Sequence, residues 1–324
     1  MTTFKEIRGT AIESVSSDPT NPETGQIWYN NTIGVLKGNL LVAAAWASGG
    51  NLGTARYGLA GAGTQTAGLA FGGVPNLANT EKYDGSAWTA SGTLNTGRDS
   101  LAGCGTQTAG LAFGGARYPG GINQTATEKF NGSTWTSNPT GLNTARFGLA
   151  GAGTQTAGLA FGGATGAGPT TTNSAAAESF NGTSWTTVNS LNTSRRYLAG
   201  AGTQTAGLAF GGGPPPSGLS NTEEYDGSIW TAGGNLNNTT RLLAGCGTQT
   251  AGLAFGGIST ATTGATESYN GSIWATTTSM STARYLLGGA GTQTAGLAFG
   301  GTPATAATEE YSAAFLSTKK ITTS

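Results

Sequence analysis

An eleven-residue string, GTQTAGLAFGG, occurs six times without change in this chain of 324 residues. The copies begin 42 to 49 residues apart, at Gly63, Gly105, Gly153, Gly202, Gly247 and Gly291. Periods of about 40 to 50 residues are typical of propeller blades and of repeats built from helix pairs. Helices are disfavoured because the repeat is rich in Gly, Thr and aromatic residues and has no 3.6-residue periodicity. The string therefore predicts an all-β protein built from six similar repeats.

One repeat, residues 56–97, divides into four expected strands: 57–64, 66–72, 80–83 and a fourth that carries Trp88. The dipeptide Asp84-Gly85 joins the last two strands, and Asp-Gly or Asn-Gly recurs at this point in four further repeats. Such a dipeptide between β-like runs is the strongest local signal for a hairpin. Each repeat is therefore expected to form a four-stranded sheet.

The residues of the second expected strand alternate in size. Leu69 and Phe71 point to one face of the sheet, whereas Gly68, Ala70 and Gly72 point to the other. A sheet with one bulky face and one bare face can stack on a copy of itself. The first strand contains almost only small residues and the fourth carries the large Trp, which is the taper expected around a central axis. We therefore expect the sheets to be arranged radially.

These motifs resemble the kelch repeat. The diglycine Gly72-Gly73 closes the second strand, and the aromatic Tyr83 is followed five residues later by Trp88. The resemblance covers about residues 46–316 and implies a kelch-like β-propeller with four-stranded blades, six in this chain. It implies little about function, because kelch propellers serve as scaffolds, as binding proteins and as enzymes.

The sixth repeat is incomplete at its end. No Trp follows Tyr311, whereas Trp46 stands before the first full repeat, ten residues ahead of Arg56, an interval that recurs in later repeats. We predict that the strand carrying Trp46 completes the sixth blade, so that an N-terminal strand closes the propeller and removes its free edges. The alternative is that residues 315–321 supply the missing strand and the Trp46 segment packs outside.

Residues 1–45 lie outside the repeats, and the propeller domain is expected over 46–324. A Pro-rich turn at 18–25 leads into an expected hairpin that carries Trp28. This segment resembles the hairpin leaders of tailed-bacteriophage structural proteins, and the whole chain resembles virion proteins of marine phages. The resemblance implies a protein made in the host cytoplasm and carried in the virion, in several copies or as a homo-oligomer, with residues 1–45 attached to other virion proteins. The alternative is a segment that only packs on the propeller.

Two kinds of charged residue recur with the repeat. An Arg lies seven residues before the string in five repeats, whereas the fifth repeat has Thr240 there and Arg241 one place later. A Glu opens the third strand of every repeat, and this strand begins at the same end of the sheet as the first strand, which the Arg precedes. The Arg side chains could form ion pairs with Glu that tie the blades together, or line a mouth that binds an anionic glycan. The candidates for this Arg ring are Arg56, Arg98, Arg146, Arg195 and Arg284.

A Gln occupies the turn between the first two strands of every repeat. Six amides at one end of the molecule could bind a sugar or an axial partner, or they could satisfy backbone groups in the turn. The six residues are Gln65, Gln107, Gln155, Gln204, Gln249 and Gln293.

The loops that follow the diglycines differ, in contrast to the strands. They hold 7, 12, 14, 10, 9 and 7 residues before the next Glu. Constant strands with unlike loops at one end are the pattern of a scaffold that presents recognition loops, although drift of unconstrained loops gives the same pattern. The candidate binding residues in these loops are Arg117, Tyr118, Asn123, Asn173 and Pro215.

Composition argues against several classes of function. The 15 basic and 15 acidic residues balance, so the chain has no charge excess to attract nucleic acid or a membrane. His, the commonest metal ligand, is absent, and no signal peptide or membrane-spanning run is visible. We therefore expect no metal, no cofactor, no nucleic acid and no membrane insertion. Cys104 and Cys246 lie in opposite repeats of a six-fold ring, so we expect no disulfide.

An enzyme is not expected. Kelch-type copper oxidases use His ligands, and the unrepeated acids Asp99, Glu224 and Glu310 form no evident pair for glycoside hydrolysis. We expect a non-enzymatic virion protein, associated with the tail or its fibres, whose loops face a host-surface receptor or glycan. The alternatives are a purely architectural part of the capsid or tail, and a cellular kelch-type module for protein interaction.

Overall fold

The computed structural model describes residues 12–117 and 121–321. By its contacts the chain divides into a repeat domain, Trp46–Ser312, and a terminal domain, Met1–Ala45 with Ala313–Ser324. Regular structure in the described residues is β-strand, as expected, apart from one 3₁₀ turn, η1 (Gly168–Thr170). None of the described residues belongs to a helix with the length and apolar character needed to cross a membrane.

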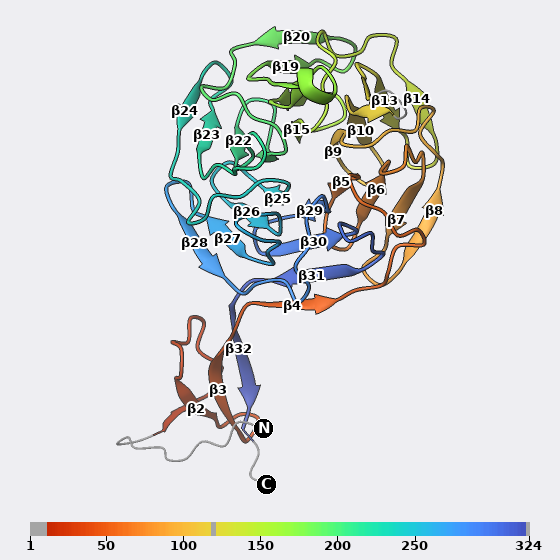
Figure 1. Ribbon diagram of the computed structural model, residues 1–324. Helices are drawn as coiled ribbons and strands as arrows, with labels where there is room; N and C mark the ends of the chain where they lie inside the picture. The colour runs from red at the N-terminus through yellow and green to blue at the C-terminus, as the bar shows by residue number, and fades with distance from the viewer. Residues whose placement is uncertain (1–11, 118–120, 322–324) are drawn as a thin grey trace. The chain divides into compact units, whose positions relative to one another are not determined.

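The described part of the repeat domain contains six four-stranded sheets with the same internal strand order (Figure 1). The first strands of the sheets are β5 (Ala60–Gly63), β9 (Ala102–Gly105), β15 (Ala150–Gly153), β21 (Ala199–Gly202), β25 (Ala244–Gly247) and β29 (Gly288–Gly291). The second strands are β6 (Gly68–Phe71), β10 (Gly110–Phe113), β16 (Gly158–Phe161), β22 (Gly207–Phe210), β26 (Gly252–Phe255) and β30 (Ala295–Phe299).

The two outer positions of each sheet carry the aromatic residues. The third strands are β7 (Thr80–Tyr83), β13 (Thr127–Phe130), β19 (Ala177–Phe180), β23 (Thr222–Tyr225), β27 (Thr266–Tyr269) and β31 (Thr308–Ser312). The fourth strands are β8 (Trp88–Ser91), β14 (Trp135–Ser137), β20 (Trp185–Val188), β24 (Trp230–Ala232), β28 (Trp274–Thr277) and β4 (Ala45–Ser48). In Figure 1 the first strands lie nearest the centre of this domain and the fourth strands lie at its periphery.

Neighbouring sheets pack by placing bulky side chains against glycine. A Cβ atom on Gly151 would lie 2.6 Å from Phe113 Cζ, and a Cβ on Gly158 would lie 2.9 Å from Leu111 Cδ2 of the preceding sheet. Only glycine leaves room for these side chains. The sixth and first sheets pack in the same way, because Phe299 and Leu297 occupy the corresponding positions against Gly61 and Gly68. The predicted stacking of a bulky face on a bare face is therefore present.

The first strands contact one another in chain order, and β29 contacts β5. A backbone hydrogen bond accompanies each contact: the residue two places after the Arg position donates its N–H to the C=O of its counterpart in the preceding repeat, at 2.7 to 2.9 Å. The N–H of Gly58 in the first repeat is bonded to the C=O of Leu286 in the sixth. All six residues have positive φ: Gly58, Ser100, Gly148, Tyr197, Leu242 and Leu286.

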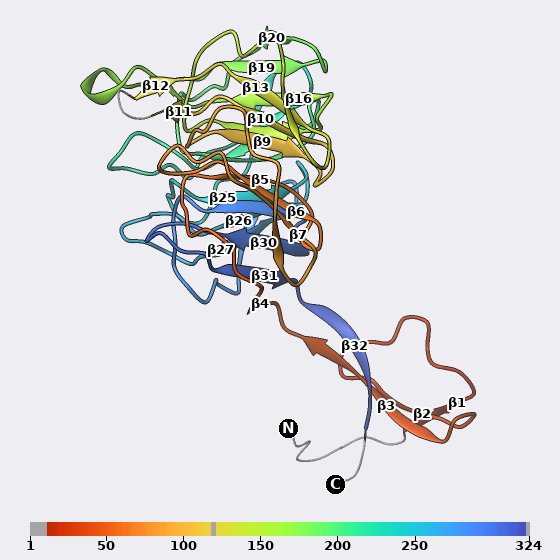
Figure 2. The same cartoon turned by 90° about the vertical axis from the view of Figure 1, so that its right-hand side faces the viewer.

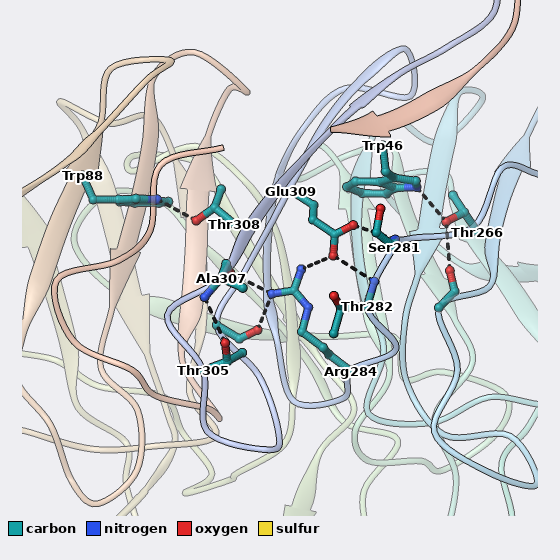
Figure 3. Close-up of polar contacts among 12 residues, drawn as sticks. Trp46, Trp88, Thr266, Ser281, Thr282, Arg284, Thr305, Ala307, Thr308 and Glu309 are labelled. Atoms are coloured by element: carbon teal, nitrogen blue, oxygen red, sulfur yellow. Dashed lines mark hydrogen bonds and ion pairs between the residues drawn. The ribbon is translucent and has the colours of Figure 1, made fainter. Parts of the chain in front are cut away.

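The Trp of each fourth strand lies against the preceding sheet. The Trp135 ring centroid lies 4.9 Å from that of Phe71, and Trp135 Nε1 donates to Thr80 Oγ1 at 2.9 Å. The same hydrogen bond forms at Trp46–Thr266 and Trp88–Thr308 (Figure 3). It also forms at Trp185–Thr127 and Trp274–Thr222.

The sixth sheet has the order β29-β30-β31-β4, so the strand that carries Trp46 is its fourth strand, as predicted. The alternative strand does not take this place, because β32 (Phe315–Lys320) pairs with β3 (Val35–Val42) over six residues. This pairing corrects the expected domain of 46–324: the chain from Ala313 onward belongs to the terminal domain.

The terminal domain contains one sheet with the order β1-β2-β3-β32, where β1 is Glu13–Val15 and β2 is Ile27–Asn30. The expected hairpin is present, since β2 and β3 pair antiparallel. Asp18 holds the Pro-rich turn to the strands by accepting hydrogen bonds from Lys37 Nζ at 2.5 Å, Asn30 Nδ2 at 2.8 Å and Trp28 Nε1 at 3.1 Å. These bonds, that from Lys37 first, lower the pKa of Asp18 to about 2.

One Trp lacks its hydrogen bond. Trp230 Nε1 is buried without a partner, because the residue that should accept from it is Ala177 rather than Thr. We expect Ala177→Thr to raise the free energy of unfolding by about 1 kcal/mol, since it supplies the missing acceptor. Denaturant unfolding would measure the change, and Thr127→Ala, which removes the acceptor of Trp185, should lower stability by a similar amount. A stability unchanged by Ala177→Thr would contradict this account of the interface.

Candidate functional site

The five repeated Arg side chains are fully buried and paired with Glu. Arg146 Nη2 lies 2.8 Å from Glu178 Oε1, and its Nη1 donates to Ala176 O at 2.6 Å. Arg284 and Glu309 show the same arrangement in Figure 3. Burial lowers the pKa of Arg146, and attraction to Glu178 acts in the opposite direction. The pairs are Arg56–Glu81, Arg98–Glu128, Arg146–Glu178, Arg195–Glu223 and Arg284–Glu309.

Each ion pair lies within one repeat and holds the linker that arrives from the preceding sheet. Glu178 Oε2 accepts the backbone N–H of Asn143 in this linker at 2.6 Å. The structural interpretation of the Arg residues therefore fits, although the pairs connect linker to sheet rather than sheet to sheet. The alternative interpretation, an Arg-lined mouth for an anionic glycan, does not fit, because guanidinium groups with an exposed fraction of 0% offer no surface to a ligand.

The fifth repeat replaces the ion pair with amide contacts. Thr240 is buried at the Arg position, and Arg241 donates from Nε to Pro216 O at 3.1 Å instead. Glu267 accepts from Asn237, from the backbone N and from Nδ2, at 2.8 Å each.

Removing one partner of a buried pair leaves the other charge uncompensated. We expect Arg146→Ala to lower the free energy of unfolding by about 3–5 kcal/mol. The exposed Arg117 offers a matched control, since Arg117→Ala should change stability by less than about 0.5 kcal/mol. Chemical denaturation would measure both, and comparable small effects would contradict a structural role for the buried Arg.

The six Gln side chains connect neighbouring sheets. Gln155 Nε2 donates to Gly110 O at 3.0 Å and to Phe130 O at 2.6 Å in the preceding sheet. Gln65 of the first repeat makes the same pair of bonds to Gly296 O and Tyr311 O of the sixth. The prediction that they satisfy backbone groups is confirmed, but the carbonyls belong to the preceding sheet rather than to the turn.

Two of the unrepeated acids have partners that the sequence did not reveal. Tyr83 Oη donates to Glu310 Oε1, and Tyr269 Oη donates to Glu224 Oε1, each at 2.5 Å across a sheet interface. Burial, and then the bonded carboxylate, raise the pKa of Tyr83 and Tyr269 to about 12. Both Cys are free and buried, as expected, and burial raises their pKa to about 12.

The raised Tyr pKa values predict loss of stability in alkali. An unfolded Tyr titrates near pH 10. A folded-state pKa of about 12 for Tyr83 and Tyr269 therefore contributes stability below pH 10 that is lost as the pH rises toward 12. We expect unfolding free energy to fall over this window and the fall to be smaller in the Tyr83→Phe, Tyr269→Phe double variant. Phe130 and Phe180 show that Phe fits this position. Ultraviolet absorbance titration would count the late-ionising phenols, and ionisation of all Tyr near pH 10 would contradict the prediction.

The loops of the second and third repeats form small hairpins on the same side of the domain (Figure 2). In one, β11 (Ala116–Arg117) pairs with β12 (Ile122–Asn123), and in the other, β17 (Ala164–Thr165) pairs with β18 (Thr172–Asn173). Arg117 and Pro215 are exposed, Asn123 and Asn173 are half-buried, and Tyr118 lies outside the described residues.

A cavity of about 430 Å³ lies between these two hairpins. Of the candidate binding residues that the structure describes, Asn123 lines it, whereas Arg117, Asn173 and Pro215 do not. Phe147, Arg196 and Tyr197 complete the wall.

Sequence reasoning missed these three residues. For Phe147 and Arg196 the available signal was the position directly after the repeated Arg, which differs in nearly every repeat within an otherwise uniform unit. The residues there are Tyr57, Asp99, Phe147, Arg196, Arg241 and Tyr285.

Neither a scan against protein-family models nor a search of curated proteins finds a match for this chain. Within residues 12–117 and 121–321, no group of three or more His, Cys, Asp or Glu is placed to hold a metal ion. The cavity between the hairpins is therefore the site on which we base a function.

Proposed function

We propose that the six sheets are the blades of a closed, six-bladed, kelch-like β-propeller. The contact of β29 with β5 and the bond from Gly58 N to Leu286 O support closure. The place of β4 in the sixth sheet supports it as well, since an N-terminal strand then completes the last blade. Such closure gives the sixth sheet four strands like the other five and leaves only the short fourth strands as edges at the periphery.

We propose that the protein is a non-enzymatic virion component of a tailed bacteriophage, associated with the tail or its fibres, whose loops contact the host surface. The proposal is supported by the division of the repeat domain into uniform and variable parts. The repeated Arg, Glu and Gln side chains bind one another or the backbone, and five of the six repeated Trp side chains bind a Thr hydroxyl of the preceding sheet, so these residues form a scaffold. The cavity between two unlike hairpins is the single observation that carries a binding role.

We propose that the terminal domain attaches the protein to other virion proteins. Its sheet exposes large apolar side chains, with exposed fractions of 60% for Leu41, 53% for Phe315 and 47% for Leu316. Exposed apolar groups that gather on one small domain favour contact with a protein partner. Attachment to a particle would place several copies of the chain side by side.

The two long loops can be replaced by a shorter loop from another repeat of the same chain. The sixth repeat connects its diglycine to its Glu with the seven residues 302–308, and we would substitute this segment for residues 116–127 and 164–177. We expect the full chain to bind host-surface glycans on an array and the shortened variant to lose binding while its unfolding midpoint changes little. Replacing 258–266 in the same way is the matched control and should preserve binding.

Two results would contradict the receptor-binding proposal. One is undiminished binding by the shortened variant. The other is a density map of assembled particles in which the loop side of the domain is buried among other virion proteins, which would favour the purely architectural role.

A further inference from the structure

We propose that the cavity between the hairpins β11–β12 and β17–β18 binds a carboxylated sugar, with Arg196 as the residue that binds the carboxylate. The inference rests on the proposed function, because it names the class of ligand for the same loops. The volume of about 430 Å³ lies in the range of roughly 300 to 1,000 Å³ typical of small-ligand sites.

Arg196 is the one charged side chain among the described residues that line the cavity. It differs from its neighbour Arg195, which is fully buried and paired with Glu223. Arg196 Nε is buried without a hydrogen-bond partner, and no ion pair is found for this guanidinium within the described residues. A planar guanidinium in this condition is suited to bind a carboxylate through two parallel hydrogen bonds.

Asn123 requires a second property of the ligand. Its Nδ2 donates to Gly166 O at 2.9 Å, which joins the two hairpins, while its Oδ1 is buried without a partner. An unpaired buried acceptor favours a ligand that brings a hydrogen-bond donor. A simple carboxylate has no hydroxyl donor, whereas a carboxylated sugar carries both groups.

Two aromatic side chains supply apolar surface beside these polar groups. The ring centroids of Phe147 and Tyr197 lie 6.0 Å apart, and Arg196 Cζ lies 5.7 Å from the Tyr197 centroid. Aromatic faces suit the C–H surface of a sugar ring, because they are large, rigid and apolar. The bond from Tyr197 N to Gly148 O at 2.7 Å fixes the backbone that carries Tyr197, so this wall is formed before a ligand arrives.

The test measures binding of the full chain to immobilised uronic-acid-containing and neutral disaccharides, by surface plasmon resonance. We expect preference for the acidic disaccharide, weakened by salt, and a loss of about ten-fold or more in its affinity in Arg196→Gln. Tyr197→Leu should weaken binding of both sugars. Leu is tolerated there because Leu242 and Leu286 occupy the equivalent positions with the same positive φ.

Arg241→Gln is the matched control, because Arg241 occupies the position equivalent to Arg196 in the next repeat and does not line the cavity. Equal affinity for acidic and neutral disaccharides, or unchanged affinity in Arg196→Gln, would overturn the inference. If shortened loops abolish glycan binding but the two point variants preserve it, the inference is wrong and the proposed function stands. If shortened loops leave binding intact, the proposed function itself is wrong.

Discussion

The seating of Leu and Phe side chains against glycine at each sheet interface is the contact on which the repeat domain depends. Phe113 and Leu111 press against Gly151 and Gly158, and any side chain at those two positions would overlap them. Burying one Leu or Phe contributes about 1.5–3 kcal/mol. Repetition of the same contact at every interface explains why the string GTQTAGLAFGG does not vary, since a change on one face would require a matching change on the next sheet.

Hydrogen bonds and ion pairs fix how the sheets and their linkers are placed in this packing. The Gln amides and the Trp indoles donate across the interfaces, whereas each Arg–Glu pair stays within its repeat and secures the incoming linker. A buried ion pair contributes little net stability, but it specifies where the chain must enter a sheet. The linker then places one residue per repeat at positive φ, and four of these six are not glycine, including Tyr197 with φ 55° and Leu286 with φ 53°. This backbone strain is sustained by the hydrogen bonds that join the repeats.

The same geometry explains where variation is tolerated. The position after the repeated Arg lies beside the loops, outside the packed interfaces, and its side chain can change without disturbing the stacking. Phe147 and Arg196 occupy it in consecutive repeats and meet at one cavity. Unlike side chains and unlike loops can therefore create a site on a scaffold that is otherwise nearly uniform.

Much of the fold could be predicted because it depends on a short sequence pattern that recurs in every repeat. Alternation of size along residues 66–72, the turn at Asp84-Gly85 and the unmatched Trp46 were sufficient for four-stranded sheets, their stacking and the fourth strand of the sixth sheet. Strand ends were less accurate: residues 57–64 were expected where β5 spans Ala60–Gly63, because the preceding residues bond to neighbouring repeats instead. The candidate site was predictable only as a choice of loops, and of the candidate residues that the structure describes, Asn123 alone lines the cavity.

The sequence by itself determined the repeat, the all-β class and the composition of each interface, because these depend on residues close together in the chain. Only the tertiary structure decided what depends on distant residues. It buried the Arg residues that were candidates for a glycan-binding mouth, and it paired Tyr83 with Glu310, 227 residues away. It also brought Asn123 and Arg196 to one cavity. These contacts between distant residues depend on the angle between successive sheets and on the path of each loop. A local sequence pattern determines neither.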